Sequence, residues 1–413
     1  MNEQIKQRIN QLNNGEVPIG YEKTEIGTFP VGWKTTTLDK LLEFKNGVNA
    51  DKEKYNSGVK MISVMDILTD SPIYYDKIKG QVDIDEKTLD TYSVTYGDIL
   101  FQRSSETFED AGKSNVYLDK DRTATYSGFV IRGKKKADYN PYFLNEALRI
   151  GQVRNQIIRN AAGSQHINVG QDSLAKIIVP LASDVEQSNI AEILMKWDEA
   201  IELQEEFLHT LEIKRMAILQ SFFSKEKCSN WIKLSDYVKE VSNRNNIGCQ
   251  NVKSVSNKNG FIDQSSQFSK QVASEDVSKY KVVTKDCVAY NPSRINVGSI
   301  AIYNEDTPGI VSPMYVVFKC VNMDPRFLLL LLETARGKYE VKSYLSGSVR
   351  DSLAFEDLKS IELAVPPKEK WGEIVDILNI IDAQYSLYND KLSFLKRQRK
   401  ALQQYLLNGI VRV

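Results

Sequence analysis

The chain contains a tandem duplication of a domain-sized unit, and this repeat limits the folds that it can adopt. Residues 163–223 align without a gap to residues 347–407, at a constant offset of 184 positions. A period of this length is that of a whole domain, so we predict two copies of one unit and not a solenoid of short repeats. The identical pairs include Gly163 and Gly347, Ser164 and Ser348, Leu174 and Leu358, Leu194 and Leu378, Asp198 and Asp382, Leu208 and Leu392, and Arg215 and Arg399.

The most regular part of each copy is a predicted long helix, over residues 184–224 and 368–413. Apolar side chains recur at alternating steps of three and four residues, which is the pattern of a coiled coil. The alternative is two amphipathic helices that each pack only on their own domain, but two matched seams favour packing of the helices on each other. The first seam consists of Ile190, Leu194, Trp197, Ile201, Gln204, Leu208, Leu211, Arg215, Ile218 and Phe222, and the second of Ile374, Leu378, Ile381, Tyr385, Tyr388, Leu392, Leu395, Arg399, Leu402 and Leu406.

The charges of the two helices predict their relative direction. Residues 184–224 carry nine acids and three bases, whereas residues 368–408 carry five acids and seven bases. The acids Glu199–Glu206 fall in the first two-thirds of the first helix, and the bases Lys391–Lys400 fall late in the second. Antiparallel packing brings these opposite charges nearer to each other than parallel packing does.

The segments outside the helices are predicted to form two mixed domains, over residues 33–183 and 225–367. Short β-rich runs alternate there with Gly, Asn, Asp, Ser and Pro, which is typical of strands and turns. Each domain is expected to end in a strand directly before its long helix. The fold class is therefore α+β: two mixed α/β domains joined by two long helices that form an antiparallel coiled coil, with a pseudo-twofold internal duplication.

The first residues of each copy are less regular than the helices. Trp33 and Trp231 are predicted to open the two copies. Residues 1–32 are predicted to form an N-terminal extension with a short helix over residues 4–12.

The composition excludes several classes of protein. Lys plus Arg and Asp plus Glu number 54 each, so the chain is not suited to coating polyanions indiscriminately, and any nucleic-acid contact must come from local basic surfaces. Four cysteines without a C-x-x-C pair favour a reducing cytoplasm. The N-terminus has no secretory h-region and the apolar run 327–332 is too short to span a bilayer, so we expect a cytoplasmic protein outside the membrane.

Three motifs resemble catalytic or cofactor sites but lack parts that the chemistry requires. Gly128-x4-Gly133-Lys134 has no Ser or Thr after the lysine and no strand before it, so it is not a phosphate loop. Asn291-Pro-Ser-Arg294 lacks the second proline and the aromatic residue of amino-methyltransferases. The two histidines are too few for a metal triad. We expect no catalytic site, cofactor or metal in this chain.

Polar and basic loop segments after two β-rich runs have the residue types that read DNA. Arg and Lys bond guanine edges or phosphates, Asn and Gln bond adenine, and Ser bonds phosphate oxygens. The candidate DNA-binding residues are Arg103, Ser104, Ser105, Lys113, Gln165, His166, Asn291, Arg294, Asn296, Ser299 and Arg350.

In these features the chain resembles the specificity subunits of type I restriction-modification systems. The resemblance extends over nearly the whole length and rests on the order and repetition of its motifs. These are Trp33 and Trp231, Gly-Asp-Ile-Leu-Phe-Gln-Arg-Ser at 97–104, Asn-Pro-Ser-Arg-Ile-Asn-Val-Gly-Ser at 291–299, Gly-Ser-Val-Arg at 347–350, and the final run from 402 to 413.

The resemblance implies a non-catalytic subunit that recognises double-stranded DNA. Two target recognition domains each read half of a bipartite site, and the helices set the half-site separation. The helices also dock two modification subunits, which hold S-adenosylmethionine and methylate adenine, while restriction subunits add ATP- and Mg-dependent translocation and cleavage. The sequence departs from the family at 105–110, which is longer and more acidic than the usual turn.

Two other functions compete with DNA recognition. The first is a coiled-coil adaptor or scaffold whose domains bind proteins, which the zero net charge favours. The second is a stand-alone enzyme, for which the sequence offers no nucleophile-plus-base constellation.

Overall fold

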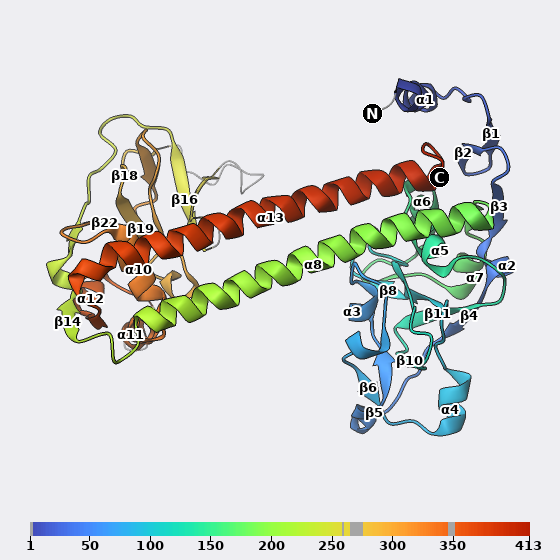
Figure 1. Ribbon diagram of the computed structural model, residues 1–413, viewed down its shortest axis with the longest axis horizontal. Helices are drawn as coiled ribbons and strands as arrows, with labels where there is room; N and C mark the ends of the chain where they lie inside the picture. Colours follow the sequence, from blue (N-terminus) through green and yellow to red (C-terminus); the bar gives the residue numbers. More distant parts are fainter. Residues whose placement is uncertain (1–2, 258–259, 265–275, 346–351) are drawn as a thin grey trace. The chain divides into compact units, whose positions relative to one another are not determined.

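The computed structural model describes residues 3–257, 260–264, 276–345 and 352–413 (Figure 1). It divides into two compact units, and both long helices cross from one unit into the other. The first unit consists of residues 1–205 and 391–413, and the second of residues 206–390. The candidate Arg350 lies outside the described residues.

The first unit combines short helices with several small sheets. Its helices are α1 (Glu3–Asn13), α2 (Leu38–Leu41), α3 (Val64–Ile67), α4 (Glu86–Thr91), α5 (Pro141–Ala147), α6 (Gly151–Arg159) and α7 (Gln171–Ala175), with the start of α8 (Asp184–Phe222) and the end of α13 (Trp371–Leu407). Its strands are β1 (Tyr21–Thr24), β2 (Gly27–Pro30), β3 (Lys34–Thr37), β4 (Leu42–Asn46), β5 (Tyr55–Ile62), β6 (Gln81–Val82), β7 (Ile99–Gln102), β8 (Ser104–Ser105), β9 (Ser114–Val116), β10 (Thr125–Tyr126), β11 (Val130–Lys135), β12 (Ile167–Asn168) and β13 (Ile178–Leu181).

The second unit repeats this plan. Its helices, besides the end of α8 and the start of α13, are α10 (Pro325–Glu333), α11 (Ala335–Leu345) and α12 (Phe355–Ser360). Its strands are β14 (Asn230–Lys233), β15 (Val238–Glu240), β16 (Val252–Ser256), β17 (Gly260–Asp263), β18 (Lys281–Val283), β19 (Cys287–Tyr290), β20 (Ile300–Ile302), β21 (Gly309–Val311), β22 (Val316–Cys320) and β23 (Glu362–Val365).

The two units share the topology of their central antiparallel sheet, which confirms the predicted duplication. The strand order is β4-β11-β7-β9 in the first unit and β15-β22-β19-β20 in the second. In each unit a strand pairs parallel beside this sheet, β10 with β5 and β21 with β16. In each, a strand at the start of the copy pairs with the strand that precedes a long helix, β3 with β13 and β14 with β23.

Matching helices in the two units begin in the same way. Asn140 caps α5 by accepting a hydrogen bond from the backbone of Phe143, and Asp324 caps α10. Each cap is followed by proline at the first helical position, where its fixed φ suits the helix and its missing N–H costs nothing.

Each hydrophobic core takes in parts of both long helices. In the first unit Phe143 packs in one cluster with Ile190 and Leu194 of α8 and with Leu406 of α13. In the second unit Phe327 packs with Ile374, Leu378 and Ile381 of α13 and with Leu219 of α8. Each domain therefore packs on the start of the helix that follows it and on the end of the other helix.

The two long helices run antiparallel in both units, as predicted. In the first unit Lys396 pairs with Glu205 at 2.6 Å, and Arg399 pairs with Asp198 at 2.8 Å. In the second unit the rings of Phe207 and Tyr388 are 4.6 Å apart. Residues later in α8 therefore lie opposite residues earlier in α13. No residue of either predicted seam is exposed.

The two tryptophans that were predicted to open the copies are not equivalent. Trp33 is buried and its Nε1 donates to Glu186 at 2.9 Å, whereas Trp231 is 63% exposed. Thr35 lies opposite Pro180 in the first unit, and Trp231 lies opposite Ala364 in the second. Because Pro180 and Ala364 are matched in the repeat, Trp231 corresponds to Thr35.

Among the residues that the structure describes, no helix is long and apolar enough to cross a membrane.

Candidate nucleic-acid interface

In the first unit the candidate residues follow the central strand β7, which is buried along its whole length. The chain then forms the short strand β8, which pairs antiparallel with β12 so that Ser104 lies opposite Asn168. The Ser104 hydroxyl also donates to the Asn168 side chain. This pairing brings the segment after β7 next to the exposed loop that holds Gln165 and His166.

Four of the six candidates in this unit line one hollow. The hollow has a volume of about 460 Å³ and a polar lining. It is lined by Leu68, Gln102, Ser104, Ser105, Glu106, Asp110, Lys113 and His166. Leu68 and Gln102 were not among the predicted residues, because Leu68 follows the short helix α3 and Gln102 ends the buried strand β7, and only the fold brings them together.

The acidic segment 105–110 forms an ion pair with one of the candidate residues. Asp110 accepts from Lys113 at 2.6 Å and from the Thr107 hydroxyl at 2.8 Å. The hydrogen bond from Lys113, followed by that from Thr107, lowers the pKa of Asp110, so that its carboxylate stays ionised. Both partners of this ion pair are half-exposed, so its strength is small and a phosphate can compete with Asp110 for Lys113.

Two other candidates of this unit lie beside the hollow and not in its lining. Arg103 is half-buried at the end of β7, and its Nη1 donates to the carbonyl of Gly128 at 3.3 Å. Gln165 is exposed in the loop before β12. By contrast Ser105, which does line the hollow, is buried and its hydroxyl donates to the carbonyl of Thr107 at 2.7 Å.

In the second unit the candidates form one loop after the buried strand β19. The backbone N–H of Asn291 donates to the carbonyl of Ser299 at 3.0 Å, which closes the loop. The Asn291 side chain accepts from Ser293, and the Ser299 hydroxyl donates to Val255 at 3.0 Å. Both residues are buried, and the bonds of the Asn291 side-chain oxygen and the Ser299 hydroxyl hold the shape of the loop.

The loop presents its remaining candidates to solvent. Arg294 and Asn296 are exposed, and the Arg294 side chain makes no hydrogen bond or ion pair with any residue that the structure describes. Gly298 follows a single 3-10 turn with φ of 89°, a conformation that glycine adopts without the steric cost of a side chain. Asn296 also lines a groove of about 790 Å³ together with Asn257 and Lys338.

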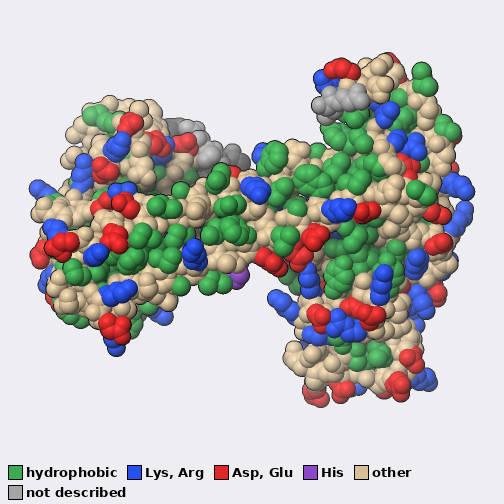
Figure 2. All heavy atoms as spheres, in the orientation of Figure 1, with side chains coloured by type: hydrophobic (Ala, Val, Ile, Leu, Met, Phe, Trp, Pro, Cys, Tyr) green, Lys and Arg blue, Asp and Glu red, His purple; other side chains and the backbone are tan. Residues whose placement is uncertain are grey.

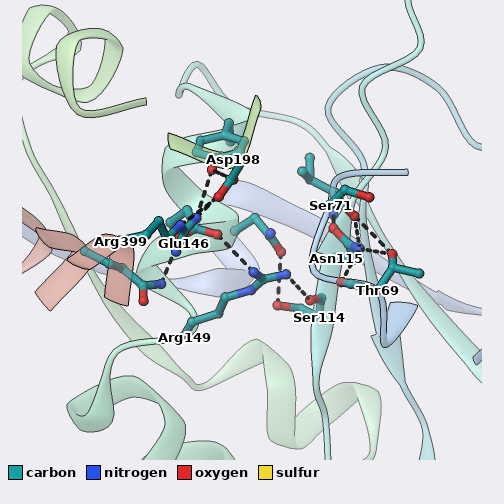
Figure 3. A network of polar contacts seen from close by, with 12 residues as sticks. Thr69, Ser71, Ser114, Asn115, Glu146, Arg149, Asp198 and Arg399 are labelled. Atoms are coloured by element: carbon teal, nitrogen blue, oxygen red, sulfur yellow. Dashed lines mark hydrogen bonds and ion pairs between the residues drawn. The ribbon is translucent and has the colours of Figure 1, made fainter. Parts of the chain in front are cut away.

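A polar network joins the candidate surface of the first unit to the helix pair (Figure 3). Asn115 of β9 donates to Ser71 at 2.9 Å and to Asp66 and Thr69 at 3.2–3.3 Å, and so holds the loop 66–71. The neighbouring Ser114 accepts at its carbonyl from Arg149. Figure 3 shows this arginine lying between the strand and the helices.

Glu146 connects this arginine to the long helices. The Glu146 side chain is 1% exposed and pairs with Arg149 at 3.2 Å and with Arg399 at 2.7 Å. Arg399 also pairs with Asp198 at 2.8 Å. Burial alone lowers the pKa of Arg399, but the charge of Glu146 and the hydrogen bond to Asp198 outweigh it, and the pKa lies above its usual value.

The second unit holds its arginine in a similar way. Arg215 of α8 pairs with Asp382 of α13 and with Glu333, at 2.5 and 2.6 Å. Arg215 and Arg399 are matched in the repeat, as are Asp198 and Asp382. Each domain is thus tied to the helix pair by one arginine and two carboxylates.

Comparison with known proteins identifies the family of the duplicated domain. A family model for the type I restriction modification DNA specificity domain matches residues 30–212 and again residues 236–397. The chain belongs to the type I restriction-modification DNA specificity family. It therefore carries two DNA specificity domains in tandem.

The similar proteins agree with this family. A putative type I restriction enzyme specificity subunit, MjaX, of Methanocaldococcus jannaschii is 25% identical over 430 aligned positions, covering 95% of this chain and 97% of the relative. The crystal structure of a type I specificity subunit from M. genitalium matches with a TM-score of 0.55 and 16% identity, over 91% of this chain and 96% of that one. A chain from a structure of the type I restriction-modification system, described for its assembly and conformational transition, matches with a TM-score of 0.54 and 14% identity, over 93% and 99%. At these identities the structural matches support the fold alone.

Proposed function

We propose that the chain is the recognition subunit of a type I restriction-modification complex and that each domain reads one half of a bipartite DNA site. The observation that carries this proposal is that both units place polar and basic side chains directly after the same central strand. In the first unit these are the residues of the hollow after β7, and in the second the loop after β19. Residues of these types bond base edges and phosphates.

The two domains would read different sequences. The first offers Lys113 and His166 in a hollow, whereas the second offers Arg294 and Asn296 on a projecting loop. Because the two surfaces differ in both residue type and shape, the two half-sites are expected to differ and the complete target to be asymmetric. With zero net charge, binding depends on these local surfaces and not on the chain as a whole.

The long helices would dock two modification subunits. Leu203 of α8 is 59% exposed and Leu387 of α13 is 67% exposed. These two leucines are matched at the repeat offset of 184, so each unit offers the same apolar residue at the same helical position. Figure 2 shows hydrophobic side chains on the surface of both helices. A surface that occurs twice can bind two copies of one partner.

The chemistry would belong to those partners. The modification subunits would bind S-adenosylmethionine and methylate adenine in both half-sites, and restriction subunits would supply ATP- and Mg-dependent translocation and cleavage. The role of this chain would be to bring them to double-stranded DNA of one sequence.

Methylation mapping tests the proposed function. The chain is co-expressed with the modification subunit of its own operon, and methylated adenines are mapped by single-molecule sequencing. The expected result is one split motif with a methylated adenine in each half. The purified complex should bind that motif with an affinity whose logarithm falls linearly with the logarithm of salt concentration. No methylation, or binding that ignores both sequence and salt, would leave the adaptor function instead.

A further inference from the structure

Phe129 is an exposed aromatic residue on an otherwise buried stretch of the first unit. From Ala124 to Gly133 every residue is buried except Phe129, which is 67% exposed. It lies at the tip of the turn that leads from β10 into β11. Exposing a phenylalanine gives up roughly 1.5–3 kcal/mol of burial energy, so a turn residue held outward among buried neighbours is a candidate for contact with a partner.

The turn that carries Phe129 is held on both sides by backbone hydrogen bonds. Val130 donates to the carbonyl of Ser127 across the turn at 2.9 Å, and Gly128 donates to the carbonyl of Val48 at 2.7 Å. The carbonyl of Phe129 itself accepts from the backbone of Arg103 at 3.0 Å. These bonds fix the backbone at Phe129, so binding has to order only the torsions of its side chain.

Polar side chains lie next to the turn that carries Phe129. The guanidinium of Arg103 reaches the carbonyl of Gly128 at 3.3 Å. The exposed Asn49 lies so close to Gly128 of this turn that a Cβ on the glycine would lie 1.8 Å from the Asn49 Oδ1. An exposed phenylalanine with an arginine and an asparagine next to its turn is unlike a protein-docking patch, which needs contiguous apolar surface.

The second unit carries a comparable residue at the corresponding turn. The turn Ser312–Tyr315 leads from β21 into β22, as the first leads from β10 into β11, and Tyr315 donates to Ser312 across it. Met314 is 58% exposed at its tip. The strand after this turn begins to pair one residue later than in the first unit. Val130 both closes its turn and pairs with Gln102, whereas here Tyr315 closes the turn and the next residue, Val316, is the first to pair, with Tyr290. Met314 is thus presented next to the loop that begins at Asn291.

We infer that Phe129 and Met314 are wedges that insert between base pairs of the DNA, one in each half-site. Phenylalanine and methionine are among the side chains that proteins insert into base steps, and arginine and asparagine commonly accompany them in the minor groove. Insertion partly unstacks one step and kinks the duplex, so flexible pyrimidine–purine steps are favoured at that position. This inference rests on the proposed function. It adds that each domain also selects DNA by how easily one base step bends, at a step whose bases no side chain reads by hydrogen bonds.

Fluorescence of 2-aminopurine tests the insertion. The complete complex with its modification subunits is bound to the mapped target, with 2-aminopurine placed in turn at each position other than the methylated adenines. In each half-site one step should become fluorescent on binding. Phe129→Ser should abolish the signal in one half only and weaken binding about tenfold, whereas Phe129→Leu, which keeps an apolar wedge, should restore most of both. Met314→Ser should do the same in the other half.

Ile19→Ser is the matched control. Ile19 is fully exposed in the same unit but lies outside the sheet, so its loss should change neither signal nor affinity. Equal fluorescence for the native chain and Phe129→Ser would overturn the inference. So would failed assembly of Phe129→Ser with the modification subunits, which would assign Phe129 to a protein contact. Loss of affinity on replacing thymine by uracil without a fluorescence change would assign it to a thymine methyl instead. If the native complex shows no sequence-specific binding at all, the proposed function itself fails.

Discussion

Arg399 donates to both carboxylate oxygens of Asp198 across the two long helices, at 2.8 and 3.1 Å. Their repeat counterparts make the same bidentate contact, because Arg215 donates to both oxygens of Asp382. A repeat that carries both an aspartate and an arginine can pair with its own copy twice only when the helices are antiparallel. In a parallel pair, the two aspartates would face each other. The duplicated sequence therefore fixes the direction of the helices through one self-complementary pair.

Arg399→Met is expected to destabilise the first unit by about 3–5 kcal/mol, because it leaves Glu146 buried without one of its cations. The free energy of unfolding in urea measures the change. Lys396→Met is the control, since its pair with Glu205 is half-exposed and should contribute under about 1 kcal/mol. Similar losses from both variants would mean that burial of Glu146 does not set the cost.

Arg294→Ala is expected to weaken specific DNA binding by about 1–3 kcal/mol if the arginine reads a base edge, and to relax specificity at that position. If it holds a phosphate, the loss should be uniform across sequences. Affinity for the mapped target and for single-base variants separates these outcomes. A normal methylation rate and pattern would place Arg294 off the interface.

Ser299→Ala is the companion variant within the same loop. Its hydroxyl is buried and bonded to Val255, so the variant should lower the unfolding free energy by roughly 1 kcal/mol without changing which bases are preferred. A change of base preference would show that the Ser299 hydroxyl turns toward the DNA on binding.

Replacing residues 225–367 by the equivalent domain of a relative is expected to change one half of the methylated motif and leave the other half unchanged. The reason is that each domain has its own central sheet and its own candidate loop. The replacement must keep apolar residues that pack on Ile374 and Leu378 of α13, since the core of the unit includes them. Altered bases in both halves would mean that recognition is not modular.

The helices were predictable because their signal is local. Spacing along the chain predicted both seams, and charge predicted their direction. The strand register was not predictable, because pairing partners are distant in sequence. Trp33 and Trp231 illustrate this: Trp33 directly precedes β3 and is buried, whereas Trp231 lies within β14 and is exposed.

The candidate site was predictable as segments and not as individual side chains. Serine and asparagine serve equally well in turns and at DNA, so residue type alone does not separate Asn291, which holds its own loop, from Asn296, which is exposed. The burial of Glu146 could not be foreseen either, since the cation that compensates it comes from Arg399 at the far end of the chain.

Lengthening both long helices by four residues is expected to move the two half-sites apart while each half keeps its sequence. Phe207 faces Tyr388 and Glu212 faces Tyr385, so duplicating residues 208–211 on α8 and 385–388 on α13 extends facing segments. Four residues add about 6 Å of helix, and an insertion of four is a stutter that an apolar seam can partly accommodate. At about 3.4 Å per base pair, the spacer should grow by one or two base pairs.

Duplicating residues 208–211 alone is the control, because one lengthened helix loses its register with the other and should yield little assembled complex. Methylation mapping of the doubly extended chain gives the answer. An active complex that kept the original spacer would mean that the helices serve as a docking surface and do not measure the distance between half-sites.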